Sequence, residues 1–302
     1  MPIAPLLPIF VFFLVGLVLR KSGIVRRDLA DLLLRIVFHV TLPVLAFLAV
    51  ADASLDVDSI FLPFIGFSVN AVCLGGAFAY CRLTGSAWRE AGTVLLGSSV
   101  ANMVFTFPFI VAVLGESALV DAVLFDLGNA VFVASVANSL AIRLGQNDSV
   151  AVRGALMRLL RTPLFIALVA AIILNFGGLR VPELLATLLS PIGKLTVPLT
   201  IVALGLSFSA INLSGSRAFF TVMLRMVCGL AGGLFSIAIF GLAGVTALVV
   251  AVSAAAPIGF SAVTLTAVAR LDTGQITAAV SLSVLIGMFS TSAILWLGRA
   301  FL

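Results

Sequence analysis

Charged residues are scarce in this chain of 302 residues. Asp, Glu, Lys and Arg together make up 10% of it, whereas soluble domains carry about 25%. Hydrophobic residues reach 62%, and the mean hydropathy is +1.31. This composition excludes an ordinary soluble domain and predicts a chain that folds in a lipid bilayer.

Histidine and cysteine are also rare. The single histidine, His39, excludes a histidine-based proton relay and a histidine-rich metal site, and we expect it to pack near the end of a span. The three cysteines show no CxxC spacing and lie in or at the ends of apolar runs. Neither a metal site nor a disulfide framework is therefore expected.

Motifs of nucleotide-driven pumps and of hydrolases are absent. The sequence has no GxxxxGK[ST], HExxH or GxSxG pattern and no pair of intramembrane aspartates. These absences exclude ATP-driven pumping by this chain and leave intramembrane hydrolysis without support. The basic residues lie between apolar runs, which indicates membrane topology rather than nucleic-acid binding. We expect no enzyme activity, no cofactor and no nucleic-acid partner.

Apolar runs of about 20 residues, the length that crosses a bilayer as a helix, recur along the chain. We predict an all-α integral membrane protein in which the first run is a retained span, because a basic segment and a cleavage site of a signal peptide are missing. The ten predicted spans are at about 2–20, 33–51, 59–81, 92–115, 118–142, 162–178, 184–208, 217–240, 244–269 and 273–298.

The basic residues are divided unequally between the two sides of the membrane. Thirteen of the 17 fall on the side reached after the odd-numbered spans, and only Arg180 and Arg299 fall on the other side. Lys194 and Arg225 lie inside spans. Because cytoplasmic loops carry the excess of Lys and Arg, both termini are predicted to face outward.

The two halves of the chain resemble each other. Thr41-Leu42-Pro43 in the second predicted span matches Thr196-Val197-Pro198 in the seventh. A duplicated unit of five spans, an odd number, must be inverted in the membrane. We therefore predict two inverted five-helix repeats, at 1–145 and 146–302, with a short linker at 144–160 between the spans.

Pro108 and Pro257 are predicted to break the fourth and ninth helices. Proline lacks an N–H and its ring clashes with a carbonyl one turn back. Broken helices at matching positions of two halves indicate the binding site of a transporter. The alternative is that nearby side chains only satisfy the interrupted backbone. The predicted substrate-binding residues are Asn102, Thr106, Pro108, Ser253, Pro257, Ser261 and Thr264.

Asp126 and Asn129 lie three residues apart, on one face of the fifth predicted helix. An acid within a span is costly and rarely faces lipid. We predict that this pair takes a coupling proton or a coupling ion. A structural pair, or a capped acid near the outer interface, is an equally open alternative.

Lys194 and Arg225 are the intramembrane cations, and either could hold an anionic substrate or pair with Asp126. Arg225 lies about eight residues into its span, so we favour snorkelling of its side chain to the cytoplasmic interface. Gly229 and Gly233 form a GxxxG pattern, which predicts close contact with a neighbouring helix.

Several segments together resemble the auxin efflux carrier family, whose bacterial members include malate and malonate permeases. The resemblance covers nearly the whole chain. The chain departs from many relatives in having Thr106 and Phe107 before Pro108, where a glycine is common, and it lacks the long central hydrophilic loop of many plant carriers. The segments are Asn102 to Pro108, Leu114-Gly115-Glu116, Phe125 to Asn129, Thr196-Val197-Pro198-Leu199, Ala203-Leu204-Gly205 and Ala255-Ala256-Pro257.

This resemblance implies a ten-helix fold in a bacterial inner membrane, with both termini on the periplasmic side. Helices 1, 2, 6 and 7 would form a scaffold, and helices 3–5 and 8–10 a transport domain in which helices 4 and 9 cross at their prolines. The family analogy also implies a homodimer through the scaffold.

The sequence thus predicts a secondary transporter, a permease for a small organic anion such as a dicarboxylate. Alternating access would operate around the crossed helices, with a proton or a sodium ion as the coupling ion. The alternatives are a membrane sensor without flux and a channel on the same fold. Paired breaks flanked by few charges favour occlusion over an open pore.

Overall fold

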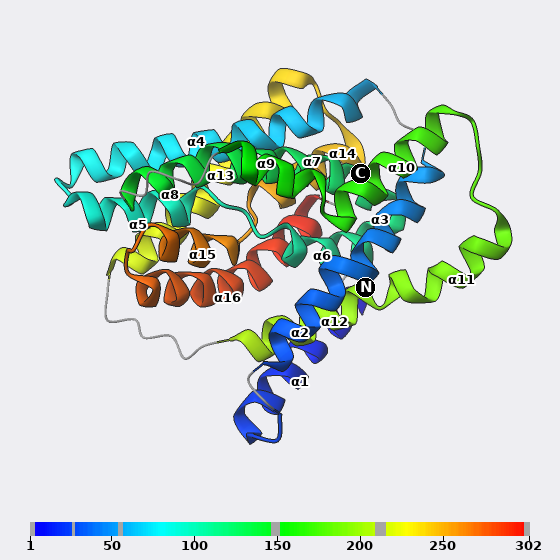
Figure 1. Ribbon diagram of the computed structural model, residues 1–302, viewed down its shortest axis with the longest axis horizontal. Helices are drawn as coiled ribbons and strands as arrows, with labels where there is room; N and C mark the ends of the chain where they lie inside the picture. Colours follow the sequence, from blue (N-terminus) through cyan, green and yellow to red (C-terminus); the bar gives the residue numbers. More distant parts are fainter. Residues whose placement is uncertain (1–3, 26–27, 54–56, 146–151, 209–215, 299–302) are drawn as a thin grey trace. The chain divides into compact units, whose positions relative to one another are not determined.

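The computed structural model describes residues 4–25, 28–53, 57–145, 152–208 and 216–298 (Figure 1). Within these ranges all regular structure is helical, apart from an isolated β-bridge between Ala101 and Ile258. The α-helices are α1 (Leu7–Ser22), α2 (Leu29–Ile36), α3 (Leu42–Ala51), α4 (Leu62–Leu83), α5 (Trp88–Ser98), α6 (Met103–Leu114), α7 (Leu119–Phe132), α8 (Asn138–Leu144), α9 (Val152–Leu160), α10 (Pro163–Phe176), α11 (Glu183–Lys194), α12 (Thr196–Ser207), α13 (Ser216–Phe240), α14 (Gly244–Ala254), α15 (Ser261–Val268) and α16 (Thr273–Gly298).

Shorter helical turns join some of these helices. The π-helical turns Val37–Thr41 and Val133–Ala137 connect α2 to α3 and α7 to α8. The 3-10 turns are Ala4–Leu6, Val57–Phe61 and Glu116–Ala118. The region 144–160, predicted to be a linker, contains α9, a helix that the sequence analysis missed.

Among the described residues, seven helical segments are long and apolar enough to cross a bilayer. A bent pair, Gly154–Leu160 with Pro163–Phe176, meets at 57° and would make an eighth. The predicted runs 92–115 and 244–269 are instead divided, into α5 and α6 and into α14 and α15. The fold is therefore that of an all-helical, multi-pass membrane protein. The seven segments are Ala4–Ser22, Leu29–Ala51, Ser59–Leu83, Glu116–Leu144, Glu183–Ser207, Arg217–Phe240 and Thr273–Gly298.

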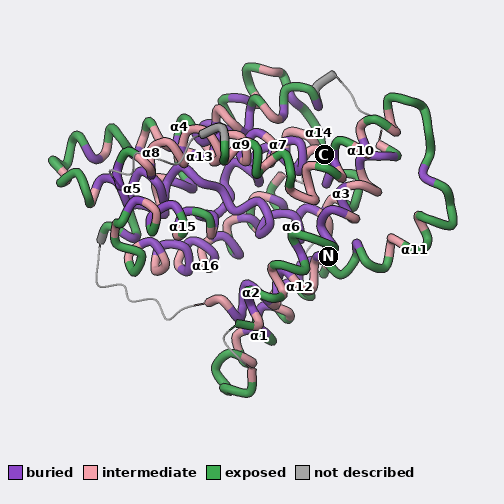
Figure 2. Tube along the Cα trace, viewed as in Figure 1, coloured by how far each residue is buried: buried purple, intermediate pink, exposed green. Residues whose placement is uncertain are grey.

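The interrupted helices are more deeply buried than the long spans. Residues 91–110 and 248–259 are buried throughout, whereas the long spans are exposed along one side (Figure 2). Large apolar side chains such as Leu14 and Ile173 are 55% and 64% exposed. Soluble proteins rarely expose so much apolar surface. In a bilayer these side chains contact lipid, and the interrupted helices are shielded from it.

The chain divides into two compact units. Unit 1 comprises Met1–Asp56, Phe107–Val123 and Arg158–Phe208, and unit 2 comprises Val57–Thr106, Leu124–Met157 and Ser209–Leu302.

In unit 1, α1 packs against α12, and α3 packs against α10 and α11. Gly16 and Gly205 lie at the α1–α12 contact, where a Cβ on either residue would collide with the backbone of the other helix. The amide of Asn175 donates to the carbonyls of Val50, Ala51 and Ala53, at 3.0, 3.2 and 2.7 Å. It thereby satisfies the open carbonyls at the C-terminus of α3.

The span of α2 and α3 stays helical through Pro43 because a π-helical turn, Val37–Thr41, lies just before it. Such a turn accommodates the missing hydrogen bond of the proline. His39 lies in this turn, with Nδ1 3.0 Å from the carbonyl oxygen of Arg35. Its side chain is exposed, so the prediction of a packed histidine was wrong.

Pro108 does not break its helix at the predicted place. It is the sixth residue of α6, and the interruption lies earlier, between the end of α5 at Ser98 and the start of α6 at Met103. A single proline removes one hydrogen bond from a helix, which the other bonds of α6 tolerate. Pro257, in contrast, does lie in the non-helical segment between α14 and α15.

In unit 2, α13 packs against α4, α5, α14 and α16 (Figure 1). Gly229 and Gly233 of α13 face Ala254 at the end of α14, and an added Cβ on either would collide with that residue. The predicted close contact of the GxxxG pattern is confirmed.

We predict that Gly229→Ala destabilises the protein and that Gly232→Ala does not. A Cβ at Gly229 would overlap the carbonyl oxygen of Ala254, whereas one at Gly232 meets Val72 at an ordinary 3.5 Å. Overpacking of this kind costs about 1–3 kcal/mol. Melting temperatures of the purified variants in one detergent check this, and equal values for the two variants would contradict it.

Candidate functional site

The candidate site is the crossing of the two interrupted helices, and it lies within unit 2. The amide of Asn102 donates to the carbonyl of Pro257 and the amide of Gly259 donates to the carbonyl of Val100, both over 2.9 Å. These two bonds form the antiparallel bridge between the interruptions. The backbone groups that the two helices cannot satisfy internally are thus partly satisfied by each other, as burial in a membrane requires.

Asn102 marks the start of α6. Its Oδ1 accepts a hydrogen bond from the amide of Phe105 over 3.2 Å, which is the arrangement of an N-cap. The side chain is 5% exposed, and its Nδ2 has no hydrogen-bond partner among the described residues. A buried amide N–H₂ without a partner is costly. It is therefore available for an acceptor that the chain itself does not supply.

A second unpaired polar atom lies on the other interrupted helix. Ser253, in the last turn of α14, is fully buried, and its Oγ has no partner within the described ranges. The segment that follows is held by α16, because Oγ of Ser283 accepts from the amide of Ile258 over 3.1 Å. The two interruptions are therefore fixed in place, while one side-chain atom beside each is left unpaired.

Arg225 does not snorkel toward the interface. Its side chain is fully buried, and the guanidinium donates to the carbonyls of Ala254 and Ala256 at 3.0 and 3.2 Å. It also donates to Oδ1 of Asn70 at 3.0 Å and to Sγ of Cys73 at 3.2 Å. The positive charge thus lies at the C-terminal end of α14, where open carbonyls and the helix dipole favour a cation.

A directed chain of hydrogen bonds connects Arg225 to Asp126. Beyond the Arg225–Asn70 bond, Nδ2 of Asn70 donates to Oδ1 of Asn129 over 2.9 Å, and Nδ2 of Asn129 donates to Oδ1 of Asp126 over 2.8 Å. A guanidinium can only donate and a carboxylate accepts, so both amide orientations follow from the ends of the chain. The predicted shared face of Asp126 and Asn129 is confirmed, and no direct Arg225–Asp126 pair forms.

This chain of hydrogen bonds also reaches the first interruption, the segment between α5 and α6. Oδ1 of Asn129 accepts from the amide of Ala101 over 3.4 Å. Asn129, an inner member of the polar chain, therefore bonds the segment before α6, and Arg225, at one end of it, bonds the segment after α14. Asn70, Asn129 and Arg225 act as internal partners for a backbone that is buried in an apolar environment.

The arrangement can hold an anion. The N-termini of α6 and α15 both lie next to the bridge, and a helix N-terminus carries a partial positive charge. Asn102 adds a free amide donor. Within the described ranges, no three His, Cys, Asp or Glu side chains gather as metal ligands.

Some predicted site residues take no part in this network. The hydroxyl of Thr106 donates to the carbonyl of Met103 within its own helix, over 2.8 Å. Ser261 and Thr264 have exposed side chains on α15. Lys194 is exposed in the last turn of α11, in unit 1.

Asn70 and Ser283 make hydrogen bonds in the site that the sequence analysis did not predict. Asn70 is fully buried in the middle of a long apolar helix, α4. An amide at such a position rarely faces lipid, and this was the available signal. Ser283 gave no signal, because serine is common in membrane helices and usually bonds its own helix.

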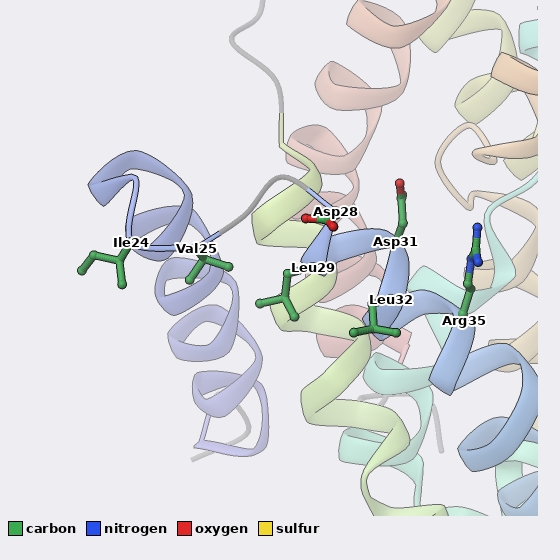
Figure 3. Close-up of a pocket in the computed structure, with 7 residues that line it drawn as sticks. All are labelled: Ile24, Val25, Asp28, Leu29, Asp31, Leu32 and Arg35. Carbon is green, nitrogen blue, oxygen red and sulfur yellow. The ribbon is translucent and has the colours of Figure 1, made fainter.

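A separate cavity of about 590 Å³ lies in unit 1, along the connection from α1 to α2 (Figure 3). It contains none of the predicted site residues. Its polar side chains, Asp28, Asp31 and Arg35, all come from the start and the length of α2 (Figure 3). We do not assign it to the candidate site.

Comparison with known proteins gives a family and two relatives. A family model described as a membrane transport protein matches residues 2–295. An uncharacterized transporter of Methanocaldococcus jannaschii is 26% identical over 219 residues, which cover 69% of each chain. An uncharacterized transporter of Methanothermobacter thermautotrophicus is 25% identical over 206 residues, which cover 67% of each chain.

We predict that Arg225→Met destabilises the protein far more than Arg217→Gln. The first change leaves the acceptors on Asn70, Ala254 and Ala256 buried without their donor, at a cost of about 1–3 kcal/mol for each group. The second removes an exposed pair of Arg217 with Glu90, worth about 1 kcal/mol or less. Melting temperatures measured side by side check this, and equal losses would refute the structural role of Arg225.

Proposed function

The chain belongs to the membrane transport protein family, the auxin efflux carrier family, and from this premise we propose that it is a secondary transporter for a small organic anion. Dicarboxylates such as malate and malonate are the substrates to test first. A transporter of this family is not an enzyme, so the proposal concerns binding and movement rather than chemistry.

The crossing in unit 2 carries the proposal. Two helix N-termini and the free Nδ2 of Asn102 offer positive electrostatic potential and a donor to a carboxylate. The hydroxyl of Ser253 offers a second polar group on the other interrupted helix. Pro257 positions the bridge through its carbonyl. We include Ser261 and Thr264, on the exposed face of α15, as residues that a substrate contacts on entry.

We propose that α5 with α6 and α14 with α15 each form one interrupted span, which brings the number of spans to ten. Support comes from their burial and from the bridge, because interrupted helices in a membrane must be buried in protein or line a cavity. The residues of the bridge, Ala101 and Ile258, are 157 positions apart, close to the 155 that separate Pro43 from Pro198. These spacings favour two inverted repeats, 1–145 and 146–302.

Within these repeats we propose that helices 1, 2, 6 and 7 form a scaffold and helices 3–5 and 8–10 a transport domain. The compact units support most of this assignment, because unit 1 contains α1, α3, α10 and α12, and unit 2 contains α4, α13, α14 and α16, whereas Phe107–Val123, from the predicted helices 4 and 5, falls in unit 1. Alternating access would move the transport domain against the scaffold, and a homodimer through the scaffold would anchor it. Pro108 falls in unit 1, and we propose only that it shapes α6.

We propose a bacterial inner membrane as the location, with both termini on the periplasmic side, and the distribution of charge supports this orientation. The excess of Lys and Arg after the odd-numbered spans supports a cytoplasmic location for those loops and periplasmic termini.

Asp126 is our proposed site for the coupling ion, either a proton or a sodium ion. Its carboxylate bonds Asn129, which in turn bonds the amide of Ala101 at the crossing. A change in the charge of Asp126 would thereby reach the interrupted helix through two hydrogen bonds.

We predict that the purified protein in proteoliposomes takes up malate or malonate saturably and exchanges it with internal substrate. Asn102→Ser should raise KM about tenfold or more, because serine keeps the N-cap but removes the amide donor to a charged group. Asn102→Asp should abolish uptake, because it replaces the donor with a negative charge.

The matched control is Thr106→Val, whose hydroxyl bonds only its own helix and whose loss should leave KM near that of the unmodified protein. Absence of uptake of every small carboxylate tested, with ligand-induced thermal stabilisation retained, would instead indicate a sensor. Non-saturable flux without exchange would indicate a channel.

We predict that Asp126→Asn abolishes the dependence of uptake on a proton or sodium gradient while substrate exchange persists. The asparagine preserves an acceptor for Asn129 but cannot change its charge. Asp272→Asn is the control, because that exposed acid caps the amides of Gly274 and Gln275 far from the polar chain in sequence. Unchanged gradient dependence in Asp126→Asn would reject the coupling role.

A further inference from the structure

Unit 2 contains an open groove of about 770 Å³ that shares no residue with the crossing. It lies between α4, α5 and the segment from the end of α7 to α8. Aromatic side chains line both of its long walls, with Phe67 and Phe78 from α4 and Phe132 from α7. Its volume is within the range of roughly 300–1,000 Å³ that is typical of small-molecule sites.

The lining is apolar along most of its length. Among the described residues that line it, only Ser135 and Ser139 carry hydroxyl groups, and both donate to carbonyls of their own helix, at Val131 and Ser135. They present no free donor to an occupant. An extended hydrocarbon is the chemistry that fits such walls.

The length of the groove corresponds to one leaflet of a bilayer. It extends along α4 from Phe67 to Phe78 and along α7 and α8 from Phe132 to Arg143. Eleven residues of helix rise about 16 Å. Half of a bilayer hydrocarbon core is about 15 Å.

One end of the groove is cationic and lies at the ends of two spans. Arg143 lines it, one residue before the span Glu116–Leu144 ends. The guanidinium of Arg82 lies 5.0 Å from the ring centre of Phe78, one residue before the span Ser59–Leu83 ends. Trp88, 62% exposed, lines the same end, and tryptophan favours the membrane surface.

Among the described residues, the acids near this end, Glu90 and Asp272, already have partners. Glu90 forms an ion pair with Arg217 over 2.7 Å, and Asp272 caps the amides of Gly274 and Gln275. Arg89 adds a further positive charge and donates to the carbonyl of Arg270, which connects α5 to the end of α15. A negatively charged headgroup would therefore meet net positive charge.

We propose that this groove binds one anionic phospholipid, with an acyl chain between Phe67 and Phe78 and the phosphate against Arg143 and Arg82. The acyl chain explains the apolar walls and their length, and the headgroup explains the arginines at the span ends. The lipid site does not involve the transported substrate, so this proposal is tested independently of the proposed function.

The first test uses tryptophan fluorescence. The chain has two tryptophans, so Trp296→Phe leaves Trp88, at the headgroup end, as the sole reporter. Phosphatidylglycerol or phosphatidylcholine with brominated acyl chains is titrated into the purified protein. We expect quenching at a lower mole fraction of phosphatidylglycerol. Arg143→Gln should reduce this preference about fivefold, the contribution of one basic residue near a membrane surface.

Two further variants make the test decisive. Gly75 lines the groove, and a Cβ there meets nothing within 4 Å, so the side chain of Gly75→Phe should project into the groove and abolish quenching by both lipids. Arg161→Gln, an exposed arginine outside the groove, is the matched charge control and should change nothing. Equal quenching by both lipids, or full quenching in Gly75→Phe, would overturn the proposal.

Discussion

The buried guanidinium of Arg225, which bonds no carboxylate among the described residues, constrains the interior of unit 2. Desolvation of such a charge costs several kcal/mol unless hydrogen bonds and local dipoles compensate. Around Arg225 the compensation comes from neutral acceptors: the carbonyls of Ala254 and Ala256, at and just beyond the end of α14, the amide oxygen of Asn70 and the thiol of Cys73. For these acceptors to be within reach, α14 must end where it does, and α4 must present Asn70 toward α13. The small side of α13 at Gly229 permits that approach.

The polar groups around the crossing fall into two sets. One set is fully used by the fold: Arg225, Asn70 and Asn129 bond each other and the interrupted backbone. The other set, the Nδ2 of Asn102 and the Oγ of Ser253, is buried and has no partner in the described part of the chain. A rigid framework that leaves a few donors unpaired is the form that selective binding requires, because an incorrect ligand leaves those donors unsatisfied. The groups that stabilise the crossing and the groups that are left unpaired there thus belong to different side chains.

Local patterns in the sequence predicted the spans well and the interruptions only in part. Apolar length identified the long helices, because a bilayer demands it, and Pro257 correctly indicated a non-helical segment. Pro108 was misleading because the break before α6 depends on the N-cap of Asn102 and on pairing with residues 157 positions away, which no local pattern encodes. The burial of Arg225 was missed for the same reason. Its position in the span permitted snorkelling, and only the packing of α13 against α4 and α14 decides which way its side chain points.

The bridge between Ala101 and Ile258 also has a consequence for biogenesis. The two residues that it joins are separated by more than half of the chain, so the segment before α6 enters the membrane long before its partner has been synthesised. Until then, Oδ1 of Asn70 has no Arg225 to accept from, and the carbonyl of Val100 and the amide of Asn102 have no second interruption to bond. The nascent first half must therefore keep these groups hydrated or temporarily paired, and the centre of unit 2 can close only as a late event, when about 260 residues have been inserted.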